Sequence, residues 1–159
     1  MPLYKSVEIN SQTIVKIWHI NESLDFLHKS VDLKTKNYER LNTMKSKLHK
    51  RAFLSVRMLL KLFGYTDHDL FYDRSGKPML KDGLYISITH SYDYSAVVVS
   101  KRPVGVDIEK QRNKIAKIAS KFLNYELNYI DKKKNNYIQE LTWIWCINCL
   151  LYTSDAADD

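Results

Sequence analysis

The chain has 159 residues, of which 45% are hydrophobic and 27% are charged, a balance typical of a soluble globular protein. No apolar run approaches the roughly 18 residues that a membrane-spanning helix needs. The first residues, MPLYKSVEIN, lack the apolar core of a secretory signal peptide. We therefore expect a cytoplasmic protein. The chain has only two cysteines, Cys146 and Cys149, so the sequence shows no framework of disulfide bonds.

The positive charge is concentrated before the C-terminus. The formal net charge is +7, and because the last nine residues contain three acids and no bases, the preceding 150 carry +10. Such an excess suits polyanionic partners: nucleic acids, phosphorylated cofactors or acidic proteins. A lysine-rich surface without a ligand is an equal alternative, since charge alone identifies no partner.

The first 64 residues predict one strand followed by two helices. Residues 13–20 (TIVKIWHI) are rich in β-branched and aromatic residues and predict a strand. Residues 21–31 predict a short helix with Asn21 as its N-cap. From Tyr38 to Phe63 the apolar residues recur at helical spacing, which predicts one long helix that ends at Gly64.

The middle of the chain predicts a turn and three strands. The turn is DRSGKPM (73–79), and the strands are residues 84–90, 95–100 and 104–109. Their short connections predict an antiparallel meander, in which the third strand runs parallel to the first. We therefore expect the ends of the first and third strands to lie together, with Thr89, His90, Asp107 and Glu109 at one end of the sheet.

Two further helices complete the predicted elements. Residues 112–123 have an apolar stripe, and residues 136–151 are apolar on most sides, which predicts a buried helix. A strand-rich first part with added helices predicts the α+β class.

The segment VGVDIEK (104–110) carries the clearest chemical signal. In a strand Asp107 and Glu109 share one face, about 6.7 Å apart, where two ionised carboxylates repel by roughly 2–3 kcal/mol at an effective dielectric constant near 20. A divalent cation such as Mg²⁺ relieves that repulsion. A solvated acidic face beside lysines is the alternative, which this pattern alone favours.

Other candidate residues each have an ordinary structural explanation. His90 in ITHS is suited to bind a phosphate or to act as a general base. Alternatively, it caps the edge of a sheet and has no ligand. Lys77 is suited to bind a phosphate as a point charge. Alternatively, it is an ordinary turn residue, in a bend set by Gly76 and Pro78. Arg51 and Arg57 belong to a basic helix whose face is either a ligand site or solvated. Cys146 and Cys149 lie inside an apolar helix, which favours buried small residues over a redox or zinc motif.

The order of these motifs is more informative than any one of them. GKPML, ISITHS, VGVDIE, KFLNYE and a Trp-bearing helix follow one another between about residues 38 and 147. This order resembles the 4′-phosphopantetheinyl transferases, in particular the larger, two-halved class of the surfactin-synthetase-activating type. That class modifies carrier proteins of fatty-acid, polyketide and non-ribosomal peptide synthesis.

The resemblance implies Mg²⁺-dependent transfer of 4′-phosphopantetheine from coenzyme A to a serine of an acyl or peptidyl carrier protein. Asp107 and Glu109 would hold Mg²⁺ and, with His90, form the catalytic group. Lys77, Thr89, His90, Arg57 and Arg51 would bind coenzyme A phosphates. The acidic carrier protein would be the partner of the basic body of the chain.

The resemblance also implies two pseudo-related α+β halves, each a small antiparallel sheet with packed helices. We assign residues 1–102 to the first half and residues 103–150 to an incomplete second half. Residues 151–159 form a tail that departs from the family and that we expect to be disordered. We expect the coenzyme A and Mg²⁺ site where the halves meet.

The sequence departs from the family after about residue 147. The family continues with a W-x-x-K-E helix and a later lysine, whose glutamate completes the metal site. Counting from Trp145, this chain has Asn148, Cys149 and Thr153 at those three positions. We therefore expect weak or no transfer, and a terminus from a truncated or frame-shifted gene.

Three alternatives stay open at this point. The first is a degenerate relative that binds coenzyme A without transferring it. The second is a basic nucleic-acid-binding module that uses the Lys/Arg helix and exposed tyrosines. The third is another Mg²⁺-dependent phosphotransferase or nuclease, because a D-x-E motif alone does not exclude one.

Overall fold

The computed structural model describes residues 3–123 and 125–155. It confirms the α+β class, with helices packed on an antiparallel sheet. The chain forms two compact units, Met1–Ile108 and Glu109–Asp159, whereas the sequence placed the boundary after residue 102.

The first unit is built on one six-stranded antiparallel sheet. Its strands are β1 (Leu3–Asn10), β2 (Thr13–His19), β3 (Leu70–Tyr72), β4 (Pro78–Leu80), β5 (Tyr85–Ser91) and β6 (Tyr94–Ser100), in the spatial order β1-β2-β6-β5-β4-β3. Strands β5 and β6 form a hairpin, and β2 pairs with the other edge of β6. The sequence predicted β2, β5 and β6, but it missed β1 and the short strands β3 and β4.

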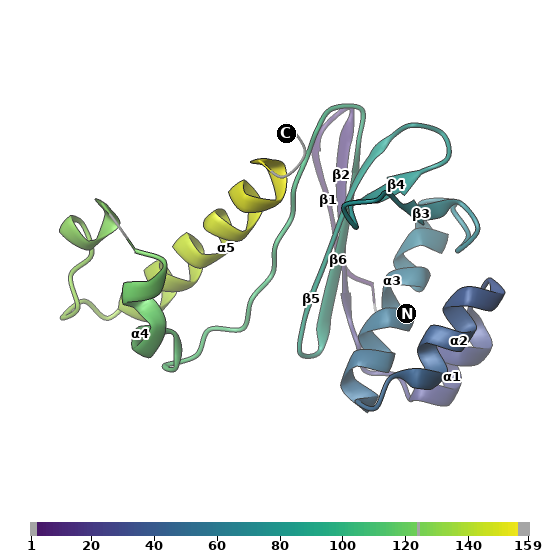
Figure 1. Ribbon diagram of the computed structural model, residues 1–159, viewed down its shortest axis with the longest axis horizontal. Helices are drawn as coiled ribbons and strands as arrows, with labels where there is room; N and C mark the ends of the chain where they lie inside the picture. The colour runs from purple at the N-terminus through teal and green to yellow at the C-terminus, as the bar shows by residue number, and fades with distance from the viewer. Residues whose placement is uncertain (1–2, 124, 156–159) are drawn as a thin grey trace. The chain divides into compact units, whose positions relative to one another are not determined.

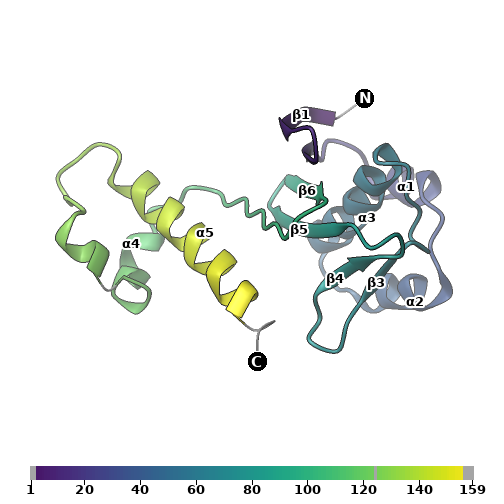
Figure 2. The same cartoon turned by 90° about the horizontal axis from the view of Figure 1, so that it is seen from above.

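Three helices cover one face of this sheet (Figures 1 and 2). They are α1 (Leu24–Ser30), α2 (Thr35–Thr43) and α3 (Lys47–Leu62). The core lies between α3 and the sheet, where Leu59 and Leu60 of α3 pack in one cluster with Ile86 of β5 and Val97 of β6. Because strand residues alternate between faces, Ile88 also lies on this α3-facing side, and Ser87 and Thr89 lie on the opposite side.

Two predicted helix boundaries are wrong. The first helix begins after Ser23, whose hydroxyl accepts a hydrogen bond from the Phe26 amide, rather than at Asn21. The predicted long helix is two helices, because the backbone is extended at Met44 and at Ser46. The Ser46 hydroxyl caps α3. The predicted stop at Gly64 is confirmed, since this glycine has a φ of +88°, which favours glycine over other residues.

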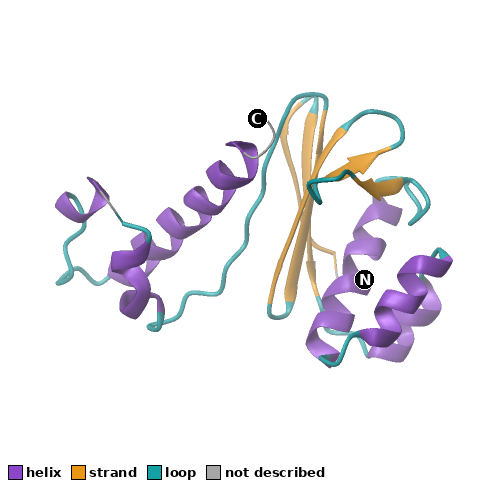
Figure 3. Ribbon diagram, viewed as in Figure 1, coloured by secondary structure: helices purple, strands orange, loops and turns teal. Residues whose placement is uncertain are grey.

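The predicted strand over residues 104–109 is also wrong. The structure describes this segment as loop (Figure 3), because its backbone forms no ladder with a neighbouring strand. Instead, the Val106 amide donates to the Ser87 hydroxyl at 3.2 Å, and the Ile108 amide contacts the Thr89 hydroxyl at 3.4 Å. The segment therefore runs in the same direction as β5, across the sheet face opposite α3, attached to side chains.

The second unit consists of helices. They are α4 (Ile115–Ile118), the 3₁₀ turns η1 (Ala119–Lys121) and η2 (Tyr125–Asn128), and α5 (Tyr137–Asp155). A small core forms around Ala119, Leu123 and Leu141. Among residues 109–123 and 125–155 the structure has no strand, which is compatible with the incomplete second half that the sequence predicted.

Helix α5 is less buried than its composition suggested. Trp143 is 55% exposed and Ile147 is 54% exposed, whereas Leu141 is fully buried. The helix continues through Asp155, into the segment that the sequence analysis treated as a separate tail, and residues 156–159 lie outside the described residues. In the described part of the chain, no helix has the length and apolar character needed to cross a membrane.

Candidate functional site

The Thr89 hydroxyl joins two of the predicted site residues. Thr89 is near the end of β5 and donates a hydrogen bond of 2.7 Å to Oδ1 of Asp107. Both residues are half-buried, so the bond is partly protected from competing water. Together with the bonds from the amides of Val106 and Ile108, it fastens the 104–108 segment to β5 and fixes the orientation of the Asp107 carboxylate.

Glu109 belongs to the second unit and lines a cavity of about 230 Å³. The cavity is lined by Lys110, Arg112 and Lys114, by Ile115 and Ile118 of α4, and by Thr142 and Trp145 of α5. Glu109 and the Trp-bearing helix of the sequence motif therefore share one cavity. The backbone hydrogen bonds Ile115 N to Arg112 O and Lys117 N to Lys114 O fold the start of this segment into turns.

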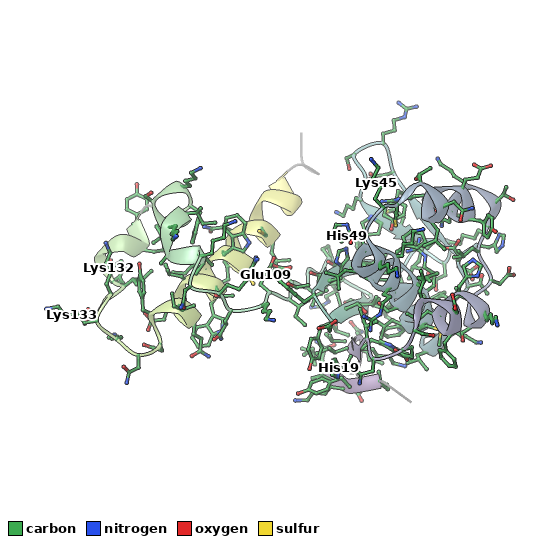
Figure 4. All side chains as sticks on the ribbon, turned by 90° about the horizontal axis from the view of Figure 1, so that it is seen from below. His19, Lys45, His49, Glu109, Lys132 and Lys133 are labelled. Atoms are coloured by element: carbon green, nitrogen blue, oxygen red, sulfur yellow. The ribbon has the colours of Figure 1, made fainter. Side chains whose placement is uncertain are left out.

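His90 lies on the other side of the sheet from Thr89. Consecutive strand residues point to opposite faces, and His90 is on the side of β5 that faces α3. Its ring centroid lies 6.4 Å from that of His49, near the start of α3. Both histidines are exposed, and Figure 4 shows His49 and Lys45 in the same region. The structure thus brings His90 together with His49, a residue that the sequence analysis did not select.

Arg51 connects α3 to two neighbouring loops. Its guanidinium donates to the Ile20 carbonyl and lies 3.9 Å from the Asp93 carboxylate in the β5–β6 turn. The Arg51 side chain is 25% exposed, and it is two residues from His49 on the same helix. It is therefore accessible in part, at the same end of α3 as the histidine pair.

Arg57 is a residue of the core. Its side chain is 4% exposed, and its Nε donates to Oδ1 of the fully buried Asp67 at 3.0 Å. The guanidinium also stacks 3.6 Å above the ring centroid of Phe53 and donates to the Phe53 carbonyl. Asp67 accepts further bonds from Asn37 and the Lys34 amide. The structure therefore places Arg57 in a buried network, away from the other predicted phosphate ligands.

Lys77 is positioned by the turn between β3 and β4. Oδ1 of Asp73 accepts bonds from the amides of Ser75 and Lys77 and from the Ser75 hydroxyl. These bonds lower the pKa of Asp73 below its ordinary value of 3.8, chiefly through the Ser75 hydroxyl. Gly76 adopts a φ of +86°, which the turn requires. The Lys77 backbone is thus ordered, in an exposed loop.

The two departing residues of α5 lie next to the cavity residue Trp145. The Asn148 amide donates to the Phe122 carbonyl at 3.0 Å, so it holds α5 to the preceding turn. Cys149 is half-buried and is four residues after Trp145, hence on the same helix face. The side chain of Thr153 lies outside the described residues. The described part of α5, Tyr137–Asp155, contains no lysine or arginine.

Several residues that no sequence motif indicated lie beside the predicted ones. They are His49, Lys110, Arg112, Lys114 and Thr142. The sequence signal for Arg112 and Lys114 is that they closely follow Glu109, in a basic segment, residues 110–121, that contains no acidic residue. No local signal identified His49, because its neighbour His90 is distant in the chain.

The comparison with known proteins points to one enzyme class. Residues of the chain are 26% identical, over 96 positions, to the 4′-phosphopantetheinyl transferase gsp of Aneurinibacillus migulanus. The similar region covers 57% of this chain and 40% of that transferase. The chain thus spans well under half the length of this relative. No protein-family model matches the chain.

Proposed function

We propose that the chain is a phosphopantetheinyl transferase that takes 4′-phosphopantetheine from coenzyme A and transfers it to a serine hydroxyl of a carrier protein, with Mg²⁺ as cofactor. The observation that carries this proposal is the hydrogen bond from Thr89 to Asp107. It joins the two most specific motifs of the resemblance, SITHS and VGVDIE. The similarity to the 4′-phosphopantetheinyl transferase of Aneurinibacillus migulanus supports the same class.

The residues present fit Mg²⁺. Asp107 and Glu109 offer hard carboxylate oxygens two residues apart, and Mg²⁺ in phosphate sites commonly uses one or two carboxylates, with waters and phosphate oxygens as the other ligands. The described residues contain no cluster of three or more potential metal-binding side chains, so the proposed site depends on the substrate to complete it. When bound, the ion would neutralise charge on the diphosphate of coenzyme A.

The chain's own residues would bind and orient coenzyme A. His90, His49 and Arg51 lie at one end of α3 and β5 and would receive the 3′-phosphate of the nucleotide, while Lys77 would contact a phosphate from the β3–β4 turn. Thr89 holds Asp107 in place, as outer partners do for metal ligands. Arg57 serves the fold, because its guanidinium is already committed to Asp67. The basic surface would attract an acidic carrier protein.

The departures in α5 argue for reduced transfer. Asn148 is neutral and already bonded to Phe122, and the thiol of Cys149 is a poor ligand for Mg²⁺. The double substitution Asn148→Lys and Cys149→Glu restores the residue types of the family at these positions and is expected to raise the transfer rate. Binding of coenzyme A without transfer, in the original chain, would identify the degenerate relative considered above.

The decisive experiment incubates the protein with coenzyme A, Mg²⁺ and an apo carrier protein, and measures the carrier's mass. Asp107→Asn, which keeps the shape of the side chain, is expected to abolish the phosphopantetheine adduct. Asp25→Asn, which alters an exposed carboxylate of α1, is the matched control and is expected to leave it unchanged. Absence of both transfer and Mg²⁺-dependent coenzyme A binding would contradict the proposal.

A further inference from the structure

The cavity of the second unit combines positive charge with an apolar wall. Lys110, Arg112 and Lys114 line it together with a single acid, Glu109. Ile115, Ile118 and Trp145 contribute the apolar surface. This combination matches a ligand that carries an anionic group on an aliphatic or amide chain. A volume of about 230 Å³ is below the roughly 300–1,000 Å³ of pockets that enclose a whole small-molecule ligand, so a larger ligand would be only partly enclosed here.

The positive charge of this cavity comes from one short segment. The described part of α5 supplies Thr142 and Trp145 but no lysine or arginine. Asn148 in the same helix is held by the Phe122 carbonyl. Any anion in the cavity must therefore be neutralised from residues 110–114, directly after Glu109. Arg112 suits this task because its guanidinium presents two parallel donors to a phosphate.

We propose that Arg112 and Lys114 bind the diphosphate of coenzyme A, and that the pantetheine arm lies against Trp145. This inference rests on the proposed function and assigns residues to it that neither the motifs nor the comparison assigned. In this chain the segment after Glu109 provides the cations that α5 does not. The two residues are exposed, so their substitution leaves the core intact.

The test measures coenzyme A affinity by isothermal titration calorimetry, in the presence of Mg²⁺, for two charge-matched double variants. Arg112→Gln with Lys114→Gln is expected to weaken binding by about ten-fold or more, since each charged contact is worth one or more decades. Lys132→Gln with Lys133→Gln removes the same charge from the loop before α5 (Figure 4) and is expected to change affinity by less than about two-fold.

A spectroscopic measurement tests the placement of the arm. Addition of coenzyme A is expected to change the intrinsic tryptophan fluorescence, and this change is expected to disappear in Trp145→Phe. Trp143→Phe is the control, because Trp143 lies on the same helix but is 55% exposed and is not part of the cavity. Dependence of the signal on Trp143 instead of Trp145 would overturn the placement.

The outcomes separate this inference from the proposed function. If the unsubstituted chain binds coenzyme A and both double variants bind equally well, the assignment of Arg112 and Lys114 is wrong while the function stands. If the unsubstituted chain does not bind coenzyme A, both the proposed function and the assignment of Arg112 and Lys114 are wrong. Inorganic pyrophosphate, used as a competitor, is expected to displace coenzyme A from the unsubstituted chain and to lose affinity in the Arg112/Lys114 variant.

Discussion

Thr89 on β5 donates a 2.7 Å hydrogen bond to Asp107, which is 18 residues later in the chain and outside the sheet. The bond matters because the 104–108 segment has no backbone ladder. Two amides and one carboxylate of this segment use side chains of β5 as partners instead. The position of the proposed metal-binding carboxylate therefore depends on hydroxyl groups.

Removing the Thr89 hydroxyl is expected to disturb the proposed metal site. Thr89→Val keeps the shape but loses the bond to Asp107, at a cost of about 1 kcal/mol in stability. Mg²⁺-dependent affinity for coenzyme A is expected to fall by about ten-fold or more in calorimetry. Thr89→Ser keeps the hydroxyl and is expected to retain most of the affinity. Equal affinity in Thr89→Val and the unsubstituted chain would refute this role.

The histidine pair is expected to discriminate between coenzyme A and its 3′-dephospho form. His90→Gln is expected to weaken coenzyme A binding by about ten-fold while leaving the binding of dephospho-coenzyme A unchanged, because the variant loses the imidazole partner of one phosphate. His49→Gln is expected to show a smaller effect of the same kind. The control is His28→Gln, which changes a histidine of α1 whose ring lies beside that of Tyr38 of α2. Parallel losses for both ligands would place the 3′-phosphate elsewhere.

Arg57 is expected to matter for folding. Arg57→Met leaves Asp67 as a buried carboxylate without its ion-pair partner, and this is expected to lower the free energy of unfolding by about 3–5 kcal/mol. The change in the free energy of unfolding is measured by urea denaturation. Arg74→Met, in the exposed turn, is expected to have almost no effect. Asp67→Asn added to Arg57→Met is expected to recover part of the loss, and full stability of Arg57→Met alone would disprove the structural role.

The turn that carries Lys77 is expected to loosen in acid. The pKa of Asp73 is lowered in the folded protein, mainly by the Ser75 hydroxyl and then by the Lys77 amide. The contribution of a carboxylate whose pKa is lowered on folding is complete above its unfolded value and is lost as the pH falls through the folded value. The amide resonances of Ser75 and Lys77 are therefore expected to shift with a midpoint below pH 3.8. Asp73→Asn is expected to remove this titration, and a transition well above pH 3.8 would contradict the assignment.

Local pattern was sufficient for the elements that depend on neighbouring residues. The strands β2, β5 and β6 and the helix stop at Gly64 follow from alternation, β-branched residues and a glycine with positive φ. The short strands β3 and β4 were missed because they have three residues each. The short connections predicted the right direction for the VGVDIE segment, but the pattern did not reveal that its partners are side chains.

The order of the motifs, and the pair Asp107 and Glu109, could be recognised in the sequence by itself, because they depend only on residue types and spacing. The tertiary structure alone decided what four charged or titratable residues do. Arg57 is buried because Asp67 meets it from another part of the chain, His90 faces α3 because the helices cover that side of the sheet, and Arg112 and Lys114 line a cavity because α5 folds back beside them. A charged side chain acts according to the partner that lies within a few ångströms of it, and that partner is set by packing between segments that are distant in the chain.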